Sequence, residues 1–145
     1  MPHLNIQIGP LGPVMDVVAS VSQPRSQALV VAGQSVPTPI VIRALVDTGA
    51  SCTCIDPNIL VSLGLSPTGS VSVHTPSTGN QAVNQDQYDV SLTFLHSKLS
   101  FNIASIPVVA SNLQIQGIDA LLGRDILNDF LLVFDGQLGV FTIGF

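Results

Sequence analysis

Short runs of apolar residues, many alternating with polar ones, recur along the chain and are separated by turn-forming residues. Val, Ile and Thr are frequent within these runs, a combination that is typical of β-strands. The pattern therefore predicts an all-β chain. The expected strands cover Leu4–Ile8, Val14–Ser22, Ala28–Val31, Ile40–Val46, Val71–Thr75, Ala82–Phe94, Leu99–Val109, Leu131–Asp135 and Leu138–Ile143.

Two short helices are expected between these strands. Asp56 followed by Pro57 is a typical helix start, because the aspartate caps free N–H groups and proline fits the first helical position. Gly64 would end this helix, and a second helix of one or two turns is expected over Arg124–Asn128. No linker, repeat or low-complexity tract divides the sequence, so residues 1–145 are expected to form a single domain.

The amino-acid composition indicates which binding partners to expect. Hydrophobic residues make up 46% of the chain and charged residues only 9%, against about 25% charged in average soluble domains. So few charges suggest that part of the surface is covered in an oligomer. The formal net charge is −5 and no Lys/Arg cluster exists, so neither nucleic acid nor an anionic membrane is expected as a partner. The sequence shows no signal peptide and no apolar run long enough to span a membrane.

Cysteine and histidine residues give no sign of a metal site. Cys52 and Cys54 are two positions apart, which disfavours a disulfide between them, and two thiols are too few for structural zinc. His3, His74 and His96 are widely separated and lack further ligand residues nearby. We therefore expect reduced thiols, no metal and no cofactor, in a cytoplasmic protein.

The strongest chemical signal is the triplet Asp47-Thr48-Gly49, which follows an apolar, β-forming run. A carboxylate at the end of a buried strand lies where water is scarce, so its proton affinity can be tuned. The triplet occurs once, so chemistry that needs two such acids would need a second copy of the chain. Downstream lies a second element of two apolar residues, a glycine and the start of a short helix. It comprises Leu121, Leu122, Gly123 and Arg124.

From about Ile40 to Phe145, these two elements make the chain resemble the retroviral-type (retropepsin-like) single-domain aspartic proteases. The resemblance implies a closed β-barrel of the acid protease fold, with one or two short helices, that is active as a two-fold homodimer. Asp47 would be the catalytic acid, Thr48 would hydrogen-bond across the two-fold axis, and Gly49 would let the substrate approach closely. The downstream element would pack beneath the active-site loop.

A hairpin at about residues 71–85 has a tip of small polar residues and falls where this family carries its flap. An ordinary surface hairpin is the alternative interpretation. The resemblance also implies an interface strand at about residues 138–145, whereas it assigns no role to residues 1–30. The residues expected to bind substrate are Gly49, Ala50, Ser51, Thr75, Pro76, Ser77, Thr78 and Gly79.

One position departs from the family pattern. Viral members often carry a second acid two residues after the glycine, where it pairs with the arginine of the downstream element. Ser51 occupies this position, so Arg124 is expected to have other partners. Ser51 and Ser77 lack a recognisable histidine partner, which argues against a serine hydrolase. The remaining acids are expected to be helix caps, turn residues or solvated side chains: Asp56, Asp119, Asp125 and Asp129.

The resemblance implies an aspartic endopeptidase that cleaves extended polypeptides. Its water would be activated by two Asp47 carboxylates, one from each chain, which share a single proton because two nearby charges of the same sign repel. The other interpretation is a catalytically weak or inactive module that keeps the fold for dimerisation or peptide binding. The intact triplet favours the enzyme, because a binding module has no need of an acid at that position.

Overall fold

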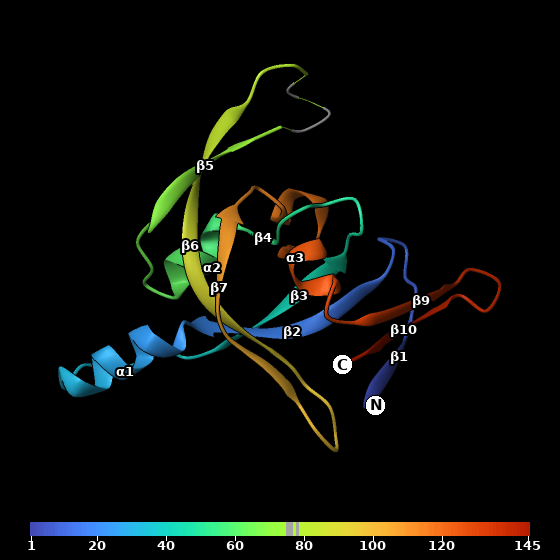
Figure 1. The fold of residues 1–145 in the computed structure, drawn as a ribbon, viewed down its shortest axis with the longest axis horizontal. Helices are drawn as coiled ribbons and strands as arrows, with labels where there is room; N and C mark the ends of the chain where they lie inside the picture. The colour runs from blue at the N-terminus through green and yellow to red at the C-terminus, as the bar shows by residue number, and fades with distance from the viewer. Residues whose placement is uncertain (75–76, 78) are drawn as a thin grey trace.

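Six strands close into a barrel in the computed structural model, which describes residues 1–74, 77 and 79–145. The closure comes from antiparallel pairing of the first and last strands of the series, β2 and β6. Figure 1 shows the barrel at the centre of the molecule. In order around it lie β2 (Val14–Val21), β3 (Ile40–Val46), β8 (Ala120–Leu122), β4 (Cys54–Ile55), β7 (Phe101–Ala110) and β6 (Val83–Phe94). The predicted all-β closed barrel is confirmed.

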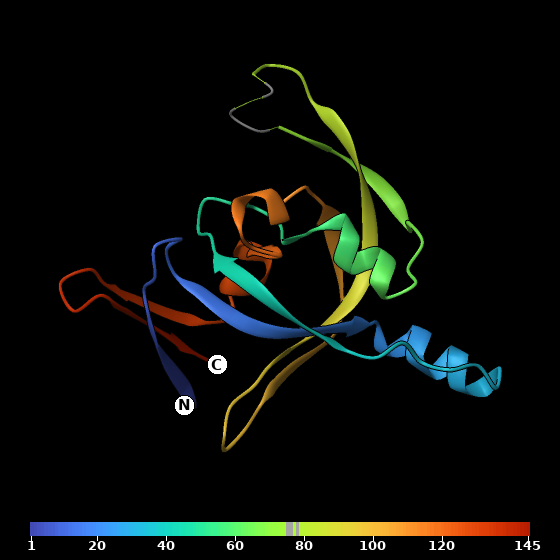
Figure 2. The ribbon, with the colours of Figure 1, turned by 180° about the vertical axis from the view of Figure 1, so that it is seen from behind.

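Strand β5 (Gly69–Val73) pairs with the first part of β6 and extends the sheet beyond the barrel. The resulting β5–β6 hairpin projects over one end of the barrel in both views (Figure 1; Figure 2). Its strands match the predicted hairpin at about residues 71–85. Because β6 is 12 residues long and also pairs with β7 and β2, the hairpin is continuous with the barrel wall.

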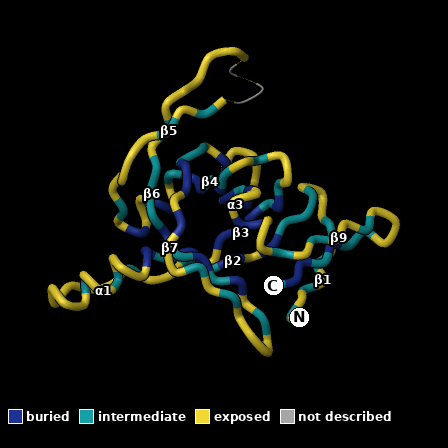
Figure 3. Tube along the Cα trace, in the orientation of Figure 1, coloured by how far each residue is buried: buried dark blue, intermediate teal, exposed yellow. Residues whose placement is uncertain are grey.

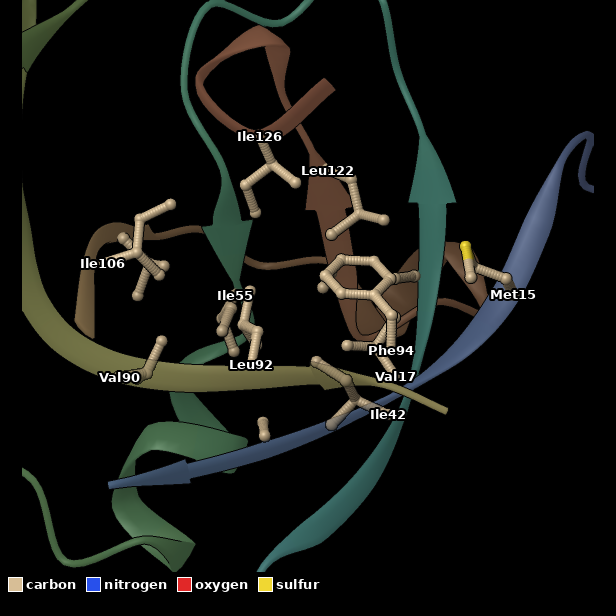
Figure 4. Packing of buried hydrophobic residues seen from close by; sticks show 14 of the residues in the cluster. Met15, Val17, Ile42, Ile55, Val90, Leu92, Phe94, Ile106, Leu122 and Ile126 are labelled. Atoms are coloured by element: carbon tan, nitrogen blue, oxygen red, sulfur yellow. The ribbon is translucent and has the colours of Figure 1, made fainter. Parts of the chain in front are cut away.

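The barrel is filled by the apolar side chains of alternating strand residues, as period-two patterning requires. In β2, Met15, Val17, Ala19 and Val21 are buried while their neighbours are more exposed. Figure 3 shows the buried residues gathered in the barrel, and Figure 4 shows Phe94 among its neighbours. The Phe94 ring is fully buried, and it meets Phe130 edge-on with ring centroids 5.1 Å apart.

In the described residues, three helices accompany the strands: α1 (Gln23–Val31), α2 (Pro57–Ser62) and α3 (Arg124–Leu127), with a 3-10 turn at Gln114–Gln116. The two predicted helices are confirmed as α2 and α3. The predicted strand at Ala28–Val31 is wrong, because these residues belong to α1. No helix in the described part of the chain is long and apolar enough to cross a membrane.

Helix α1 forms because the capping residue and proline at its start favour a helix more than the two valines at its end favour a strand. The Ser22 hydroxyl accepts a hydrogen bond from the Arg25 N–H at 3.4 Å, and Pro24 occupies the first turn, where its missing N–H costs nothing. None of the helix residues is buried, and the helix extends away from the barrel (Figure 1).

A second, three-stranded sheet joins the two ends of the chain. Strand β10 (Val140–Gly144) lies between β1 (His3–Gln7) and β9 (Leu131–Asp135), antiparallel to both. Strand β10, which covers most of the interface strand expected at about residues 138–145, therefore has no free backbone edge within the described chain. The sheet edges open to further strands belong to β1 and β9, and the first residues of the chain thus acquire a structural role.

Asp56 connects α2 to the segment before β8 through hydrogen bonds. Because its carboxylate is charged, the free energy of unfolding should depend on pH. Its buried carboxylate accepts hydrogen bonds from the N–H groups of Asn58, Leu113 and Gln114 at 2.8–2.9 Å. Burial by itself raises the pKa of Asp56, but these three donors outweigh it and hold the pKa below its usual value. The predicted helix cap is confirmed.

Replacing Asp56 with asparagine should lower the free energy of unfolding by about 2 kcal/mol at neutral pH. Because the folded-state pKa lies below the ordinary value, the stabilisation is complete above the ordinary value and disappears as the pH falls through the folded-state value. Urea unfolding at several pH values should therefore show the two proteins converging in strong acid. Asp129→Asn, at an exposed position, is the control, and an equal loss at every pH would contradict the prediction.

Candidate active site

Asp47 follows β3 directly and lies where this strand leaves the barrel. Strand β3 pairs with β8 in parallel, with Val46 opposite Leu122, and the Asp47 N–H continues this ladder by donating to the Leu122 carbonyl at 3.0 Å. Asp47 itself is half-buried. The barrel therefore fixes the backbone of this residue while leaving its carboxylate accessible.

The residues after Asp47 form a tight turn that holds the carboxylate. The Gly49 N–H donates to Asp47 Oδ1 at 2.9 Å, and the Ala50 N–H donates to the Asp47 carbonyl at 3.2 Å. A Cβ at position 49 would lie 3.1 Å from Asp47 Oδ1, so any larger residue would crowd the acid. Glycine therefore keeps the acid uncovered.

The downstream element contacts this turn through Arg124. The Arg124 N–H donates to the Ala50 carbonyl at 2.9 Å, and Arg124 Nη1 donates to the Thr48 carbonyl at 2.8 Å. Arg124 thus pairs with a main-chain oxygen of the acid turn. Arg124 was expected to have a partner other than residue 51, and the Thr48 carbonyl is that partner.

Thr53 joins the same network and was not singled out in the sequence. Its fully buried hydroxyl accepts from the Gly123 N–H at 3.1 Å and donates to Asp125 Oδ1 at 2.8 Å, while its own N–H donates to Asp125 Oδ2 at 2.9 Å. Asp125 is therefore a structural acceptor as well as an exposed acid. Asp119 plays a similar part, accepting from the Arg43 N–H at 2.9 Å.

Gly123 lies so close to the chain at Cys52 that no other residue fits. A Cβ there would come within 2.5 Å of the Cys52 carbonyl carbon and oxygen, which are backbone atoms and cannot rotate away. Gly123→Ala should therefore lower the free energy of unfolding by about 3 kcal/mol, as measured by chemical denaturation. Gly9→Ala is the matched control, because a Cβ at Gly9 would meet nothing within 4 Å. Equal stability of the two variants would contradict this account.

Two adjoining hollows lie between the acid turn and the β5–β6 hairpin. The first, of about 440 Å³, includes Asp47, and the second, of about 520 Å³, includes Asp125. They share Ser51, Cys52, Val73 and His74, so together they form one groove. The other lining residues are Gly49, Ala50, Cys54, Gln85, Ser111 and Leu121 in the first hollow, and Val71, Ser72, Gln87, Pro107 and Val109 in the second.

The groove includes some of the predicted binding residues. Gly49, Ala50 and Ser51 line it. Ser77 and Gly79 are exposed turn residues of the hairpin, and neither lines the two hollows. Thr75, Pro76 and Thr78 lie outside the described residues. Of the downstream element, Leu121 lines the groove, Leu122 and Gly123 are buried, and Arg124 is exposed.

Both cysteines are unpaired and line the groove. Burial, with a further contribution from neighbouring Cys52, raises the pKa of Cys54 to about 12. Its thiol therefore stays protonated and is a poor nucleophile. Among the described residues no group of His, Cys, Asp or Glu is arranged to hold a metal ion. Two acids line the groove, Asp47 in the first hollow and Asp125 in the second.

An acid on a tight turn, at the end of a closed barrel and below a long hairpin, defines the acid protease fold. The family model described as aspartyl protease matches residues 28–126, and the chain belongs to this family. No curated protein sequence matches the chain.

Several solved structures are similar to the chain. A retropepsin-like aspartic protease from Rickettsia conorii is 19% identical with a TM-score of 0.58, over 99% of this chain and 90% of that one. This likeness shows the retropepsin-like fold. The retroviral protease-like domain of Ddi1 from Leishmania major is 12% identical with a TM-score of 0.40, over 86% and 83% of the respective chains.

Proposed function

We propose that the protein is an aspartic endopeptidase in which Asp47 is the catalytic acid. The observation that carries this proposal is the placement of Asp47. Its backbone is fixed by the barrel, its Oδ1 accepts from the Gly49 N–H, and its half-buried side chain lines the groove. Membership in the aspartyl protease family supports the same chemistry.

The mechanism needs two such acids, and each chain supplies one. In a homodimer the two Asp47 carboxylates would face each other across the two-fold axis and share one proton, so their pKa values belong to the pair. The ionised acid takes a proton from a water molecule, and the protonated acid donates to the carbonyl oxygen of the substrate. Attack by water gives a tetrahedral intermediate, and proton transfer to the amide nitrogen releases the amine.

The groove suits an extended peptide. The acid turn forms one wall, and the β5–β6 hairpin supplies Val73, His74 and Gln85 to the other. A peptide strand between them can form backbone hydrogen bonds while alternate side chains enter the two hollows. In this arrangement the hairpin takes the place of the family's flap.

Exposed apolar surface supports the proposed dimer. On the hairpin of β9 and β10, Leu131, Val133, Phe134 and Leu138 are all at least half exposed. A two-fold interface would use the acid turns, the hairpin tips and the terminal sheet. Because β10 is paired on both sides, any added backbone pairing in that sheet would come from β1 or β9.

The test is peptide cleavage by the purified protein between pH 3 and 7, alongside sedimentation to measure its oligomeric state. We expect cleavage that a statine-type inhibitor blocks, from a species of dimer mass. Tight peptide binding without turnover would support the inactive-module interpretation instead. Cleavage by a protein that stays monomeric at every concentration would refute the two-chain mechanism.

A further inference from the structure

We propose that Asp125 makes the second hollow of the groove selective for a lysine or arginine side chain of the substrate. This inference rests on the proposed function and names the substrate class that the site would prefer. It is carried by the charge of the hollow, its apolar walls and the way Asp125 is held.

The charge of the groove is unbalanced. Asp47 and Asp125 both line it, and no lysine or arginine is among the described lining residues. The adjacent Arg124 donates to the Thr48 carbonyl. Within the described part of the chain, the Asp125 carboxylate has hydrogen-bond donors but no ion-pair partner. A cationic side chain would therefore meet an uncompensated negative charge in this hollow.

The walls of the hollow suit the stem of such a side chain. Val71, Val73, Pro107 and Val109 line it together with Asp125. Lysine and arginine bury their methylene stems against apolar surface while the charged end stays with a polar or charged group. A peptide side chain of this kind would thus contact the valines along its length and the carboxylate at its end.

Asp125 is held in place before any ligand arrives. Thr53 donates to both of its oxygens, at 2.9 Å from the N–H and 2.8 Å from the hydroxyl. A carboxylate offers about four lone-pair positions, so roughly two remain free for a substrate. Because Thr53 is fully buried, the acid need not lose side-chain freedom when it binds a cation, which strengthens an otherwise weak exposed pair.

The experiment compares peptides that differ only in charge. Lysine and Nε-acetyl-lysine share the same stem, so each position on both sides of the cleaved bond is scanned with one and then the other. We expect at least one position at which lysine raises kcat/KM about three- to tenfold over acetyl-lysine. Asp125→Asn should remove this preference, and Asp129→Asn, an exposed acid outside the groove, should keep it.

Binding to the Asp47→Asn protein at pH 7.5 separates this inference from the proposed activity, because it needs no turnover. The same lysine preference in affinity, lost in Asp47→Asn/Asp125→Asn, would support the selectivity even if the wild type cleaved nothing. Should Asp125→Asn fail to fold, raising the salt concentration on the Asp47→Asn protein should weaken the preference for lysine. Equal use of both peptides at every position, or a preference that survives Asp125→Asn, would overturn the inference.

Discussion

Replacing Asp47 with asparagine should lower peptide cleavage by at least about 10³-fold while leaving the fold intact. Asparagine keeps an oxygen that can accept from the Gly49 N–H, so the turn should retain its shape. What it cannot do is exchange a proton with water. Initial cleavage rates and thermal unfolding of the same preparations are the two measurements.

Asp135→Asn is the matched control for this substitution. Asp135 also holds a turn through its Oδ1, which accepts from the N–H groups of Gln137 and Leu138 at 2.9–3.0 Å, but it lies outside the groove. Its variant should cleave at the wild-type rate. Undiminished cleavage by Asp47→Asn would show that the acid does not act.

The Asp47→Asn variant also tests whether two chains share one active site. If wild-type and Asp47→Asn chains exchange freely in equal amounts, only about a quarter of the dimers contain two acids. Activity should then fall to about that fraction of the wild-type level, rather than to the half expected from independent chains. A linear dependence on the wild-type fraction would contradict a shared site.

Phe141→Ala should lower the free energy of unfolding by about 3–5 kcal/mol, a large part of the 5–15 kcal/mol typical of whole domains. Phe141 is fully buried on β10, the central strand of the terminal sheet. Phe134, its partner in the register with β9, is 59% exposed. Phe134→Ala should therefore cost the folded monomer less than about 1 kcal/mol, and denaturant titration at protein concentrations where the monomer predominates should separate the two. Similar losses would mean that β10 does not anchor the terminal sheet.

Sequence reasoning succeeded where the signal is local. The turn at Asp47 follows from an apolar strand and a glycine, and α2 follows from Asp56 and Pro57. Helix α1 was missed because Val30 and Val31 favour strands, and because Ser22 was assigned to the end of the preceding strand rather than to a helix cap. The spacing of apolar residues shows which side of an element is buried. It does not show whether a helix-capping residue or two β-branched residues will determine the local structure.

The parts that sequence reasoning missed depend on partners far away in the chain. Strand β4 is two residues long and exists because Cys54 pairs with both Val109 and Leu121. Asp125 lines the groove although nothing near it in the sequence marks it as a lining residue, whereas Gln85 falls at the end of the hairpin predicted at about residues 71–85. Long-range pairing of this kind leaves no periodic trace.

The pairing of β3 with β8 also determines when during synthesis the acid turn can form. Asp47 and Ala50 receive their support from Leu122 and Arg124, which are synthesised long after the turn itself. Before β8 has been synthesised, β3 lacks its parallel partner and the Asp47 N–H lacks the Leu122 carbonyl as acceptor. The acid turn therefore reaches its final geometry only after the segment through Arg124 has been synthesised.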